Sequence, residues 1–370
     1  MSILRLSVLV IFFATSWTPS TAVGSSTLLL ARPRSLSPAN TGAPLTAWAA
    51  SIAAQSAADA SRLATLLAVP LLDARPKSKG HSSRRSFVPI APGRQILSIP
   101  NYVARARLGT PAQTLLVAID PSNDAAWIPC SACVGCAPAA TSPSFSPTES
   151  STYRSVHCGA PQCAQVPGAA SCPGGPGASC AFNLTYGSST FQAVLGHDVL
   201  ALEDGTGAAA SAYTFGCLRV VTGGSVPPQG LLGFGRGPLS FLSQTKDTYG
   251  SVFSYCLPSY KSSNFSGTLR LGPVGQPKRI KTTPLLYNPH RPTLYYVDMT
   301  GIRVGGKAVA VPASALALDA ATGSGGTIVD AGTMFTRLSP PCTPPCATRS
   351  GAGCGCPCPR RWAGSTRATT

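Results

Sequence analysis

Short apolar runs that end in Asp, Gly or Pro recur along the middle of the chain. Residues 101–108 alternate between apolar and polar side chains and then enter Gly109-Thr110-Pro111. Leu115–Ile119 and Thr327–Val329 are short apolar runs, and Tyr295–Met299 is rich in strand-forming residues. Such runs, bounded by turn residues, predict short strands. The sequence therefore predicts an all-β fold with few helices, one of them in the Ala-rich stretch 48–69.

Two of these apolar runs end in the same way. Asp120 follows the first and Asp330 follows the second, and each Asp begins a turn-like tetrapeptide, Asp-Pro-Ser-Asn or Asp-Ala-Gly-Thr. Asp often initiates turns because its carboxylate bonds the backbone that follows, so one such motif alone indicates only a turn. The repeat is informative because it places one carboxylate at the end of each of two buried strands.

The neighbouring motifs add to this pair. They comprise Tyr102 to Pro111, Ala126-Trp127-Ile128-Pro129-Cys130, Leu184-Thr185-Tyr186-Gly187, Gly230 to Ser240, and Cys130, Cys133 and Cys136 with Phe253-Ser254-Tyr255-Cys256. In this order they resemble plant pepsin-like aspartic proteases of the nepenthesin-like branch, whose relatives include a chloroplast nucleoid DNA-binding protease. The resemblance covers about residues 101–340, and the second lobe of the family is apparently truncated in this chain.

The resemblance implies a pepsin-like bilobal acid protease fold with an incomplete second lobe. It implies a secreted aspartic endopeptidase that uses Asp120 and Asp330 as its catalytic pair, with no metal and no cofactor. It assigns Tyr186 to the flap over bound peptide, with Trp127 as its support, and places Gly332 and Thr333 among the substrate-binding residues. Two close carboxylates share one proton, so that one can activate water while the other polarises the scissile carbonyl.

Both Asp loops depart from the family pattern. The family usually has Thr or Ser directly after each catalytic Asp, whereas this chain has Pro121 and Ala331, which carry no hydroxyl. Asn123 and Thr333 offer an amide and a hydroxyl near the two carboxylates instead. Because polar partners set the orientation and pKa of a carboxylate, we expect a weakened dyad.

The remaining segments suggest processing. Residues 1–22 read as a signal peptide whose apolar run is too short for a membrane span. Residues 23–97 form either a propeptide or a disordered leader. The predicted lobes then run over 98–281 and 282–341. The tail, 342–370, is rich in Cys, Pro and Arg without any strand or helix period; it resembles a coding region read in a shifted frame, and the alternative is a small metal-binding tail.

Charge and composition narrow the partners. The chain has 29 Lys and Arg against 12 Asp and Glu, a net charge of +17. Residues 101–338 contain fifteen Lys and Arg against ten Asp and Glu, so most of the excess positive charge lies outside the recognisable domain. Nucleic-acid binding needs a basic face on the folded domain, so it remains the weaker alternative. We expect a monomer with a polypeptide substrate, free of the membrane, located outside the cell or in the apoplast, with the vacuole or plastid as alternatives.

Cysteine content supports an oxidising compartment. The resemblance implies the bridges Cys130–Cys133, Cys136–Cys217, Cys158–Cys180 and Cys163–Cys172, which leaves Cys256 unpaired. A zinc site at Cys130, Cys133 and Cys136 is the rival, weakened by the lack of a second ligand cluster. Asn183 and Asn264 lie in glycosylation sequons.

Two further functions compete with proteolysis. Plant pepsin-like inhibitors of fungal xylanases keep this fold without protease activity, and the altered Asp loops allow that function here. A truncated product without a stable fold is the other alternative, because a half-built lobe exposes sheet edges and apolar surface.

Overall fold

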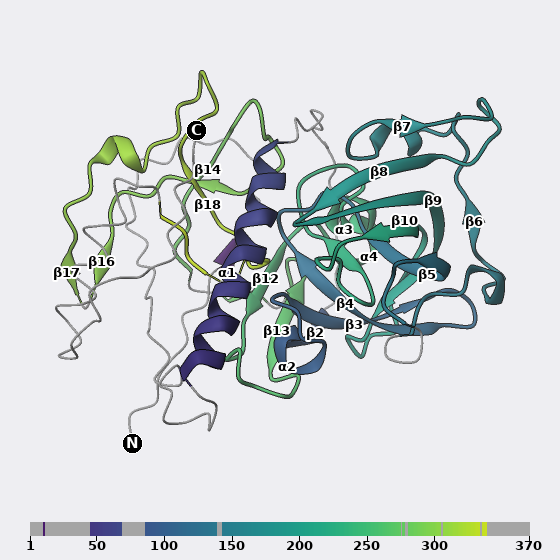
Figure 1. Cartoon of the computed structure of the whole chain (residues 1–370), viewed down its shortest axis with the longest axis horizontal. Coiled ribbons are helices and arrows are strands. Elements are labelled where there is room, and N and C mark those ends of the chain that lie inside the picture. The colour runs from purple at the N-terminus through teal and green to yellow at the C-terminus, as the bar shows by residue number, and fades with distance from the viewer. Residues whose placement is uncertain are drawn as a thin grey trace.

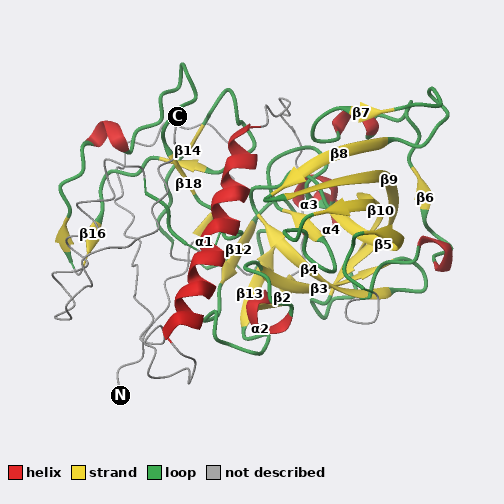
Figure 2. Cartoon of the chain, in the orientation of Figure 1, coloured by secondary structure: helices red, strands yellow, loops and turns green. Residues whose placement is uncertain are grey.

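A computed structural model describes residues 10–11, 45–68, 86–138, 143–274, 276–277, 280–304, 306–333 and 335–338. The signal peptide beyond Val10–Ile11, most of the leader and the tail 342–370 lie outside these residues. Within them strands predominate, so the prediction of an all-β fold is confirmed (Figure 2). No helix in the described part of the chain combines the length and apolarity that crossing a bilayer requires.

Most strands belong to the first lobe. They are β1 (Val10–Ile11), β2 (Ser86–Pro92), β3 (Tyr102–Leu108), β4 (Gln113–Asp120), β5 (Trp127–Val134), β6 (Arg154–Ser155), β7 (Ala170–Ser171), β8 (Ala181–Tyr186), β9 (Ser189–Leu202), β10 (Ala209–Thr222), β11 (Leu231–Gly233), β12 (Phe253–Cys256) and β13 (Gly267–Leu271). The second lobe contributes β14 (Leu285–Leu286), β15 (Tyr296–Val297), β16 (Arg303–Val304), β17 (Lys307–Ala308) and β18 (Thr327–Ile328).

Helices are few and mostly short. They are α1 (Leu45–Ala68), α2 (Gly93–Ile96), α3 (Phe241–Gln244) and α4 (Lys246–Tyr249), with the 3₁₀ turns η3 (Pro147–Glu149), η4 (Cys163–Gln165) and η5 (Ala313–Ala315). The long helix α1 agrees with the helix predicted over 48–69. Its sequence is dominated by Ala and Leu, the residues that favour a helix most.

One thirteen-stranded sheet forms the first lobe. Its order is β1-β12-β13-β2-β3-β4-β11-β5-β10-β9-β8-β7, with β6 against β9. β11 lies parallel to β4 and pairs Gly233 with Asp120, so the Leu-Leu-Gly strand passes beside the first Asp as the resemblance implied. The structure also places Ser86–Pro92 in β2, between β13 and β3. The end of the segment predicted as leader is therefore part of this sheet.

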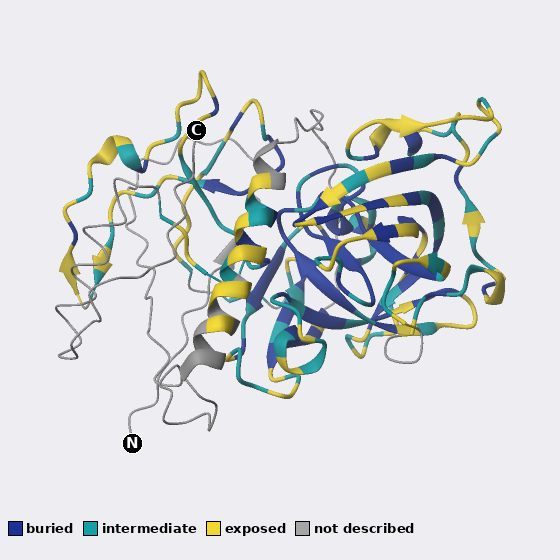
Figure 3. Ribbon diagram, in the orientation of Figure 1, coloured by how far each residue is buried: buried dark blue, intermediate teal, exposed yellow. Residues whose placement is uncertain are grey.

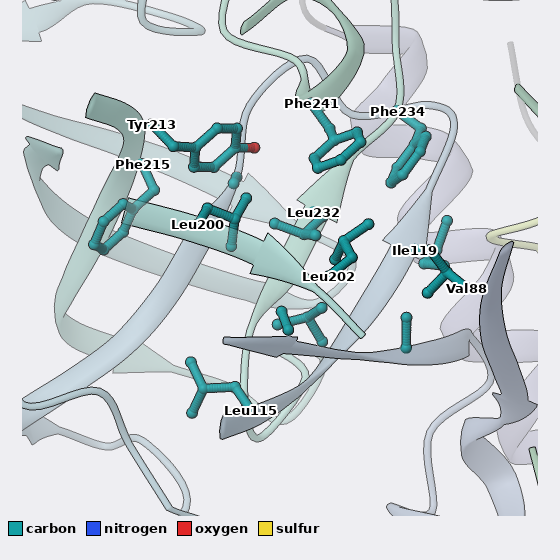
Figure 4. Close-up of a cluster of buried hydrophobic side chains, with 14 of the residues drawn as sticks. Val88, Leu115, Ile119, Leu200, Leu202, Tyr213, Phe215, Leu232, Phe234 and Phe241 are labelled. Atoms are coloured by element: carbon teal, nitrogen blue, oxygen red, sulfur yellow. The ribbon is translucent and has the colours of Figure 1, made fainter. Parts of the chain in front are cut away.

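Two apolar clusters fill the two faces of this sheet. Because side chains alternate across a strand, Leu115, Val117 and Ile119 of β4 join one cluster, whereas Ala118 joins the other. Figure 4 shows part of the first cluster, in which the rings of Phe234 and Phe241 stack at 4.8 Å. Asp120 lies two residues after Ala118 in the same strand, so its carboxylate is on the same face as Ala118. The cluster on that face includes Trp127 and Tyr186.

The second lobe is smaller and more exposed. It consists of the sheet β14-β15-β18 and the hairpin β16-β17. Figure 3 shows that most of this hairpin is exposed, in contrast to the strands of the first lobe. The lobe is anchored through Leu294, Tyr295 and Tyr296, each about 1% exposed. Figure 1 shows α1 standing between the large sheet and the small sheets of the second lobe.

Four disulfides link the eight cysteines 130–217 that were expected to pair, but their partners differ from the expected ones. The bridges are Cys130–Cys217, Cys133–Cys136, Cys158–Cys172 and Cys163–Cys180. The pairing implied by the resemblance is therefore wrong. Burial explains the outcome, because fully buried Cys130 faces fully buried Cys217 across β5 and β10, whereas Cys133, near the end of β5, and Cys136, just after it, are less buried. The sulfurs that suggested zinc are thus in disulfides, and Cys256 is a free thiol.

We predict that peptide mapping of the non-reduced protein will recover a cross-link between the peptides of Cys130 and Cys217. The second pair of bridges is a stricter test, because Cys163 Sγ also lies 4.0 Å from Cys172 Sγ. Digestion that cuts between Cys158 and Cys163, between Cys163 and Cys172, and between Cys172 and Cys180 should release Cys163 linked to Cys180. Recovery of Cys163 with Cys172 would contradict the structure at that bridge.

Candidate functional site

Asp120 lies at the end of β4, where β11 and the residue that follows it fix its backbone. Its carbonyl oxygen accepts a hydrogen bond from the N–H of Phe234 at 2.7 Å, and Gly233 is its partner on β11. A Cβ at Gly233 would lie 2.5 Å from the carbonyl oxygens of Asn123 and Ala125, so only glycine allows this close approach. The Asp120 side chain is fully buried.

Asp330 occupies the equivalent place in the second lobe, two residues beyond β18. The N–H of Val329 donates to the carbonyl oxygen of Tyr295 at 3.0 Å, which holds the chain against the second sheet up to the residue before Asp330. Both aspartates then initiate turns, as the sequence predicted for this residue type.

The two loops hold their carboxylates in the same way. Oδ1 of Asp120 accepts the N–H of Ser122 at 2.9 Å, and Oδ1 of Asp330 accepts the N–H of Gly332 at 2.8 Å. Oδ2 of Asp120 accepts the Asn123 amide at 2.9 Å, and Oδ2 of Asp330 accepts the Thr333 hydroxyl at 2.5 Å. The third residue after each Asp therefore supplies the polar partner that Pro121 and Ala331 cannot.

A cation from α1 lies between the two carboxylates. Arg62 Nη2 is 2.5 Å from Asp120 Oδ1 and 3.4 Å from Asp330 Oδ1, so these two oxygens are at most 2.5 + 3.4 = 5.9 Å apart. Arg62 Nε donates to Asp120 Oδ2 at 3.2 Å, and Nη1 donates to Asp330 Oδ2 at 2.6 Å and to the Thr333 hydroxyl at 2.5 Å. One guanidinium thus brings together the two aspartates that the sequence singled out.

Neighbouring residues of α1 bind the segment after Asp330. Asp59 Oδ2 accepts the N–H of Phe335 at 3.0 Å, and Arg337 donates to the carbonyl oxygen of Ser56. Asp59 and Arg62 are three residues apart, so they lie on one face of the helix. Both side chains are almost fully buried, at 1% and 4% exposure.

The hairpin of β8 and β9 covers the other side of the Arg62 guanidinium. Tyr186, at the end of β8, donates its hydroxyl to Asp120 Oδ2 at 3.1 Å and accepts the Asn101 amide at 3.3 Å. Trp127 packs edge-on against the Tyr186 ring with 5.0 Å between centroids, in the supporting position that the resemblance implied. The Arg62 guanidinium carbon lies 5.9 Å from the centre of the same ring. The carboxylates are therefore enclosed by α1 and Tyr186.

These contacts determine the charges in the site. Burial alone would raise the pKa of Asp330, but the Arg62 guanidinium and the donors from Thr333 and Gly332 hold it below its ordinary value. Burial opposes the charge on Arg62, yet Asp120 and Asp330 raise the pKa of Arg62 well above its ordinary value. Burial and the charge of Asp120 raise the pKa of Tyr186, so it remains a neutral donor.

Sequence reasoning missed Arg62, Asp59 and Asn101. A signal was present for the first two, because they are the only charged residues in the 24 residues of α1 and lie three apart. Two isolated charges on one face of an Ala-rich helix indicate a polar contact rather than a solvated surface. Both sequon residues, Asn183 and Asn264, are exposed and lie far from these contacts in sequence.

Comparison with known proteins relates the chain to plant proteins. A family described as "Xylanase inhibitor N-terminal" matches residues 102–273, and "Xylanase inhibitor C-terminal" matches 294–342. "Aspartyl protease 25" of Oryza sativa subsp. japonica is 47% identical over 278 residues, which cover 71% of this chain and 61% of the relative. "Aspartyl protease AED3" of Arabidopsis thaliana is 47% identical over 256 residues, 69% of this chain and 56% of the relative. The chain thus spans about six-tenths of the length of these relatives.

More distant matches agree. "Aspartic proteinase nepenthesin-2" of Nepenthes gracilis is 33% identical over 241 residues, 64% of this chain and 52% of the relative. Among solved structures, basic 7S globulin from soybean aligns with a TM-score of 0.50 at 23% identity, over 68% of this chain and 66% of the globulin. At that identity the match shows a shared fold only, and that fold is the pepsin-like one that the sequence predicted.

We predict that α1 is held in the site at neutral pH and released in acid. Because the folded pKa of Asp330 is lowered, its ion pair stabilises the docked helix above the ordinary Asp pKa of 3.8, and this contribution is lost as pH falls through the lowered value. Hydrogen exchange, corrected for the pH dependence of the intrinsic rate, should show protected amides in residues 56–64 at pH 7 and loss of protection below pH about 4.

The Arg62→Met variant is the matched test of the cause. It leaves two facing carboxylates uncompensated, a change that costs about 3 to 5 kcal/mol when one partner of a buried pair is removed. Exchange in residues 56–64 should then be fast already at pH 7, while β9 and β10 stay protected. Equal protection of this segment in wild type and Arg62→Met would show that the ion pairs do not hold the helix.

Proposed function

The chain belongs to the plant pepsin-like aspartic proteases, and on that basis we propose that Asp120 and Asp330 are the catalytic dyad of an aspartic endopeptidase. The observation that supports this most strongly is the single guanidinium bonded to both carboxylates, with at most 5.9 Å between two of their oxygens. A pair that can share one cation of this size can also share one water molecule. The proposed substrate is a polypeptide, as the names of the aspartyl protease relatives suggest.

Removal of Arg62 would change the chemistry of the pair. Two carboxylates this close cannot both ionise easily without a cation, so they would share a proton and titrate as a coupled pair. The ionised member would take a proton from water, and the protonated member would donate to the scissile carbonyl oxygen. The water oxygen would bond to the carbonyl carbon, the C–N bond would break, and the leaving nitrogen would receive a proton from the dyad.

We propose that α1 is a propeptide element that keeps this dyad inactive. Arg62 occupies the space that the water would need and pairs with both carboxylates, while Asp59 and Ser56 fasten the helix to the segment after Asp330. Because β2 is part of the main sheet, release of α1 would require a cut or a long displacement of the chain within residues 69–85. Four disulfides favour an oxidising location, so we propose secretion, with the vacuole as the alternative.

A binding protein without protease activity is the second candidate. Its support is the family description of "Xylanase inhibitor" and the absence of a hydroxyl at residues 121 and 331. The geometry favours the enzyme over this candidate, because both aspartates, their loop donors and Tyr186 converge on one place.

Cleavage assays with Asp→Asn variants test the dyad. The acid-treated full chain should cleave a denatured protein at pH about 3 to 5, and pepstatin should inhibit it. Asp120→Asn and Asp330→Asn should each reduce the rate by about a thousandfold, since each removes one half of the shared-proton pair. Asp298→Asn, at an exposed acid of the second lobe, is the matched control and should retain the rate. No cleavage by a folded wild type, together with tight binding of a glycoside hydrolase, would favour the inhibitor.

The Arg62→Ala variant tests the inhibitory role of Arg62. Arg62→Ala should cleave substrate at pH about 5 without prior acid treatment, at a rate at least about tenfold above untreated wild type, because the cation no longer masks the dyad. Arg303→Ala, which removes an exposed cation from β16, should behave as wild type. After full acid activation all three proteins should reach the same rate. If untreated Arg62→Ala cleaved substrate no faster than untreated wild type, inhibition by Arg62 would be contradicted.

A further inference from the structure

Asp124 is a buried carboxyl group that the proposed chemistry does not use. It lies four residues after Asp120, in the same loop, and its hydrogen-bond partners Gly237 and Thr293 lie outside that loop. Oδ1 accepts the N–H of Gly237 at 2.7 Å, and Oδ2 accepts the Thr293 hydroxyl at 2.7 Å. The residue is 8% exposed. A buried carboxyl with such specific partners requires an explanation.

The hydrogen-bond partners of Asp124 come from two segments outside its own loop. The first is the loop after β11, which carries Gly237 and in which Gly235 also donates its N–H to the carbonyl oxygen of Asn123 at 2.7 Å. The second is in the second lobe, where Thr293 also accepts the N–H of Arg236 at 3.2 Å through its carbonyl oxygen. Asp124 is therefore the point at which the first catalytic loop meets the second lobe.

The packing around Asp124 leaves no room for a side chain at Gly235 or Gly237. A Cβ at Gly235 would lie 2.4 Å from Asp124 Oδ1, and one at Gly237 would lie 2.5 Å from Asp124 Cβ. Both glycines are thus needed for the β11 loop to approach this carboxyl. The Tyr295 hydroxyl reinforces the same junction, since it donates to the carbonyl oxygen of Phe234 at 2.6 Å.

We propose that Asp124 is a positioning residue that locks the Asp120 loop to the second lobe through Thr293 and thereby sets the separation of Asp120 and Asp330. This inference rests on the function proposed above. Asp330 is carried by the second lobe, so any looseness at the junction becomes looseness between the two carboxylates. A displacement of about 1 Å at reacting groups can cost about a hundredfold in rate.

The ionisation of Asp124 suits acidic conditions. Burial raises its pKa to about 6, although the donors from Thr293, Gly237 and Arg236 and the charge of Arg236 act in the opposite direction. The ionisable groups that influence it among the described residues are Arg236, in the β11 loop, and Tyr295, in the second lobe. Below that pH the neutral acid can accept from Gly237 through one oxygen and donate to the Thr293 hydroxyl through the other.

The sign of the pH effect follows from the raised pKa. Because the folded-state pKa exceeds the ordinary value of 3.8, the stabilisation from protonated Asp124 is fully present below pH about 3.8 and is lost as pH rises through about 6. The lock is therefore strongest in the pH range in which a coupled pair of aspartates would work.

Thr293→Val and Thr293→Ser provide the central experiment, because Val keeps the volume of Thr without its hydroxyl and Ser keeps the hydroxyl. In the full chain at pH 4, amides of residues 121–126 should exchange faster by about tenfold or more in Thr293→Val than in Thr293→Ser. In the acid-activated protein, kcat of Thr293→Val should fall about tenfold to a hundredfold with KM within about twofold, whereas Thr293→Ser should match wild type.

Asp124→Asn and Asp124→Ala test the carboxyl itself. Asn has one carbonyl oxygen that accepts and one NH2 group that donates, so it resembles the protonated acid at these two partners. It should retain loop protection and kcat at pH 4, and it should remove the loss of stability that wild type shows between pH 4 and 7. Asp124→Ala should lose kcat as Thr293→Val does. Equal loop exchange and equal kcat in Thr293→Val and Thr293→Ser would overturn the proposal, as would a loss in Asp124→Asn as large as that in Asp124→Ala.

The exchange measurement separates this proposal from the proposed function. If wild type cleaves no substrate while Thr293→Val still loosens residues 121–126, the lock stands and the protease assignment fails. If wild type cleaves and the loop does not respond, the protease assignment stands and the lock fails.

Discussion

The contact of one guanidinium with two buried carboxylates is the interaction on which the rest of this structure depends. Asp120 and Asp330 come from different lobes, and like charges so close would repel in a medium of low dielectric constant. Arg62 makes their approach favourable, because it gives each carboxylate a charge-assisted hydrogen bond. The helix, the flap tyrosine and the segment after Asp330 are all arranged around this cation. The described state is therefore one in which the same acids that suit catalysis serve to hold the two lobes and α1 together.

The sequence of α1 suits this position. Its Ala-rich composition gives it a high helix propensity, which lowers the cost of ordering the segment. A buried ion pair is a weak source of net stability, because desolvation offsets most of the attraction. Such a contact is better suited to a switch, since protonation of Asp330 would remove its attraction to Arg62 but leave the cost of burying the cation. The predicted release of α1 in acid therefore needs no additional sensor.

Most of the first lobe and both aspartates could be predicted from the sequence, because the strands follow local patterns of apolar and polar residues that end in a turn residue. The contacts of Asn123 and Thr333 were also within reach, since they are local to each Asp. The disulfide partners could not be derived in this way, because connectivity depends on which sulfurs are buried together after folding. Arg62 was missed for a related reason: the helix was predicted from its composition, but the position of Arg62 between the two aspartates is a tertiary contact across 268 residues of sequence to Asp330.

The two Asp loops show how a changed motif can keep the same geometry. A hydroxyl directly after the Asp and a polar side chain three residues after it can both reach the carboxylate, so the loss of the first at Pro121 and Ala331 does not leave either acid without loop donors. The junction of Asp124 with Thr293 and Gly237 ties the first loop to the second lobe. In the proposed arrangement the separation of the carboxylates depends on the buried contact of Asp124 with Thr293, and the residues immediately after each Asp are free to vary.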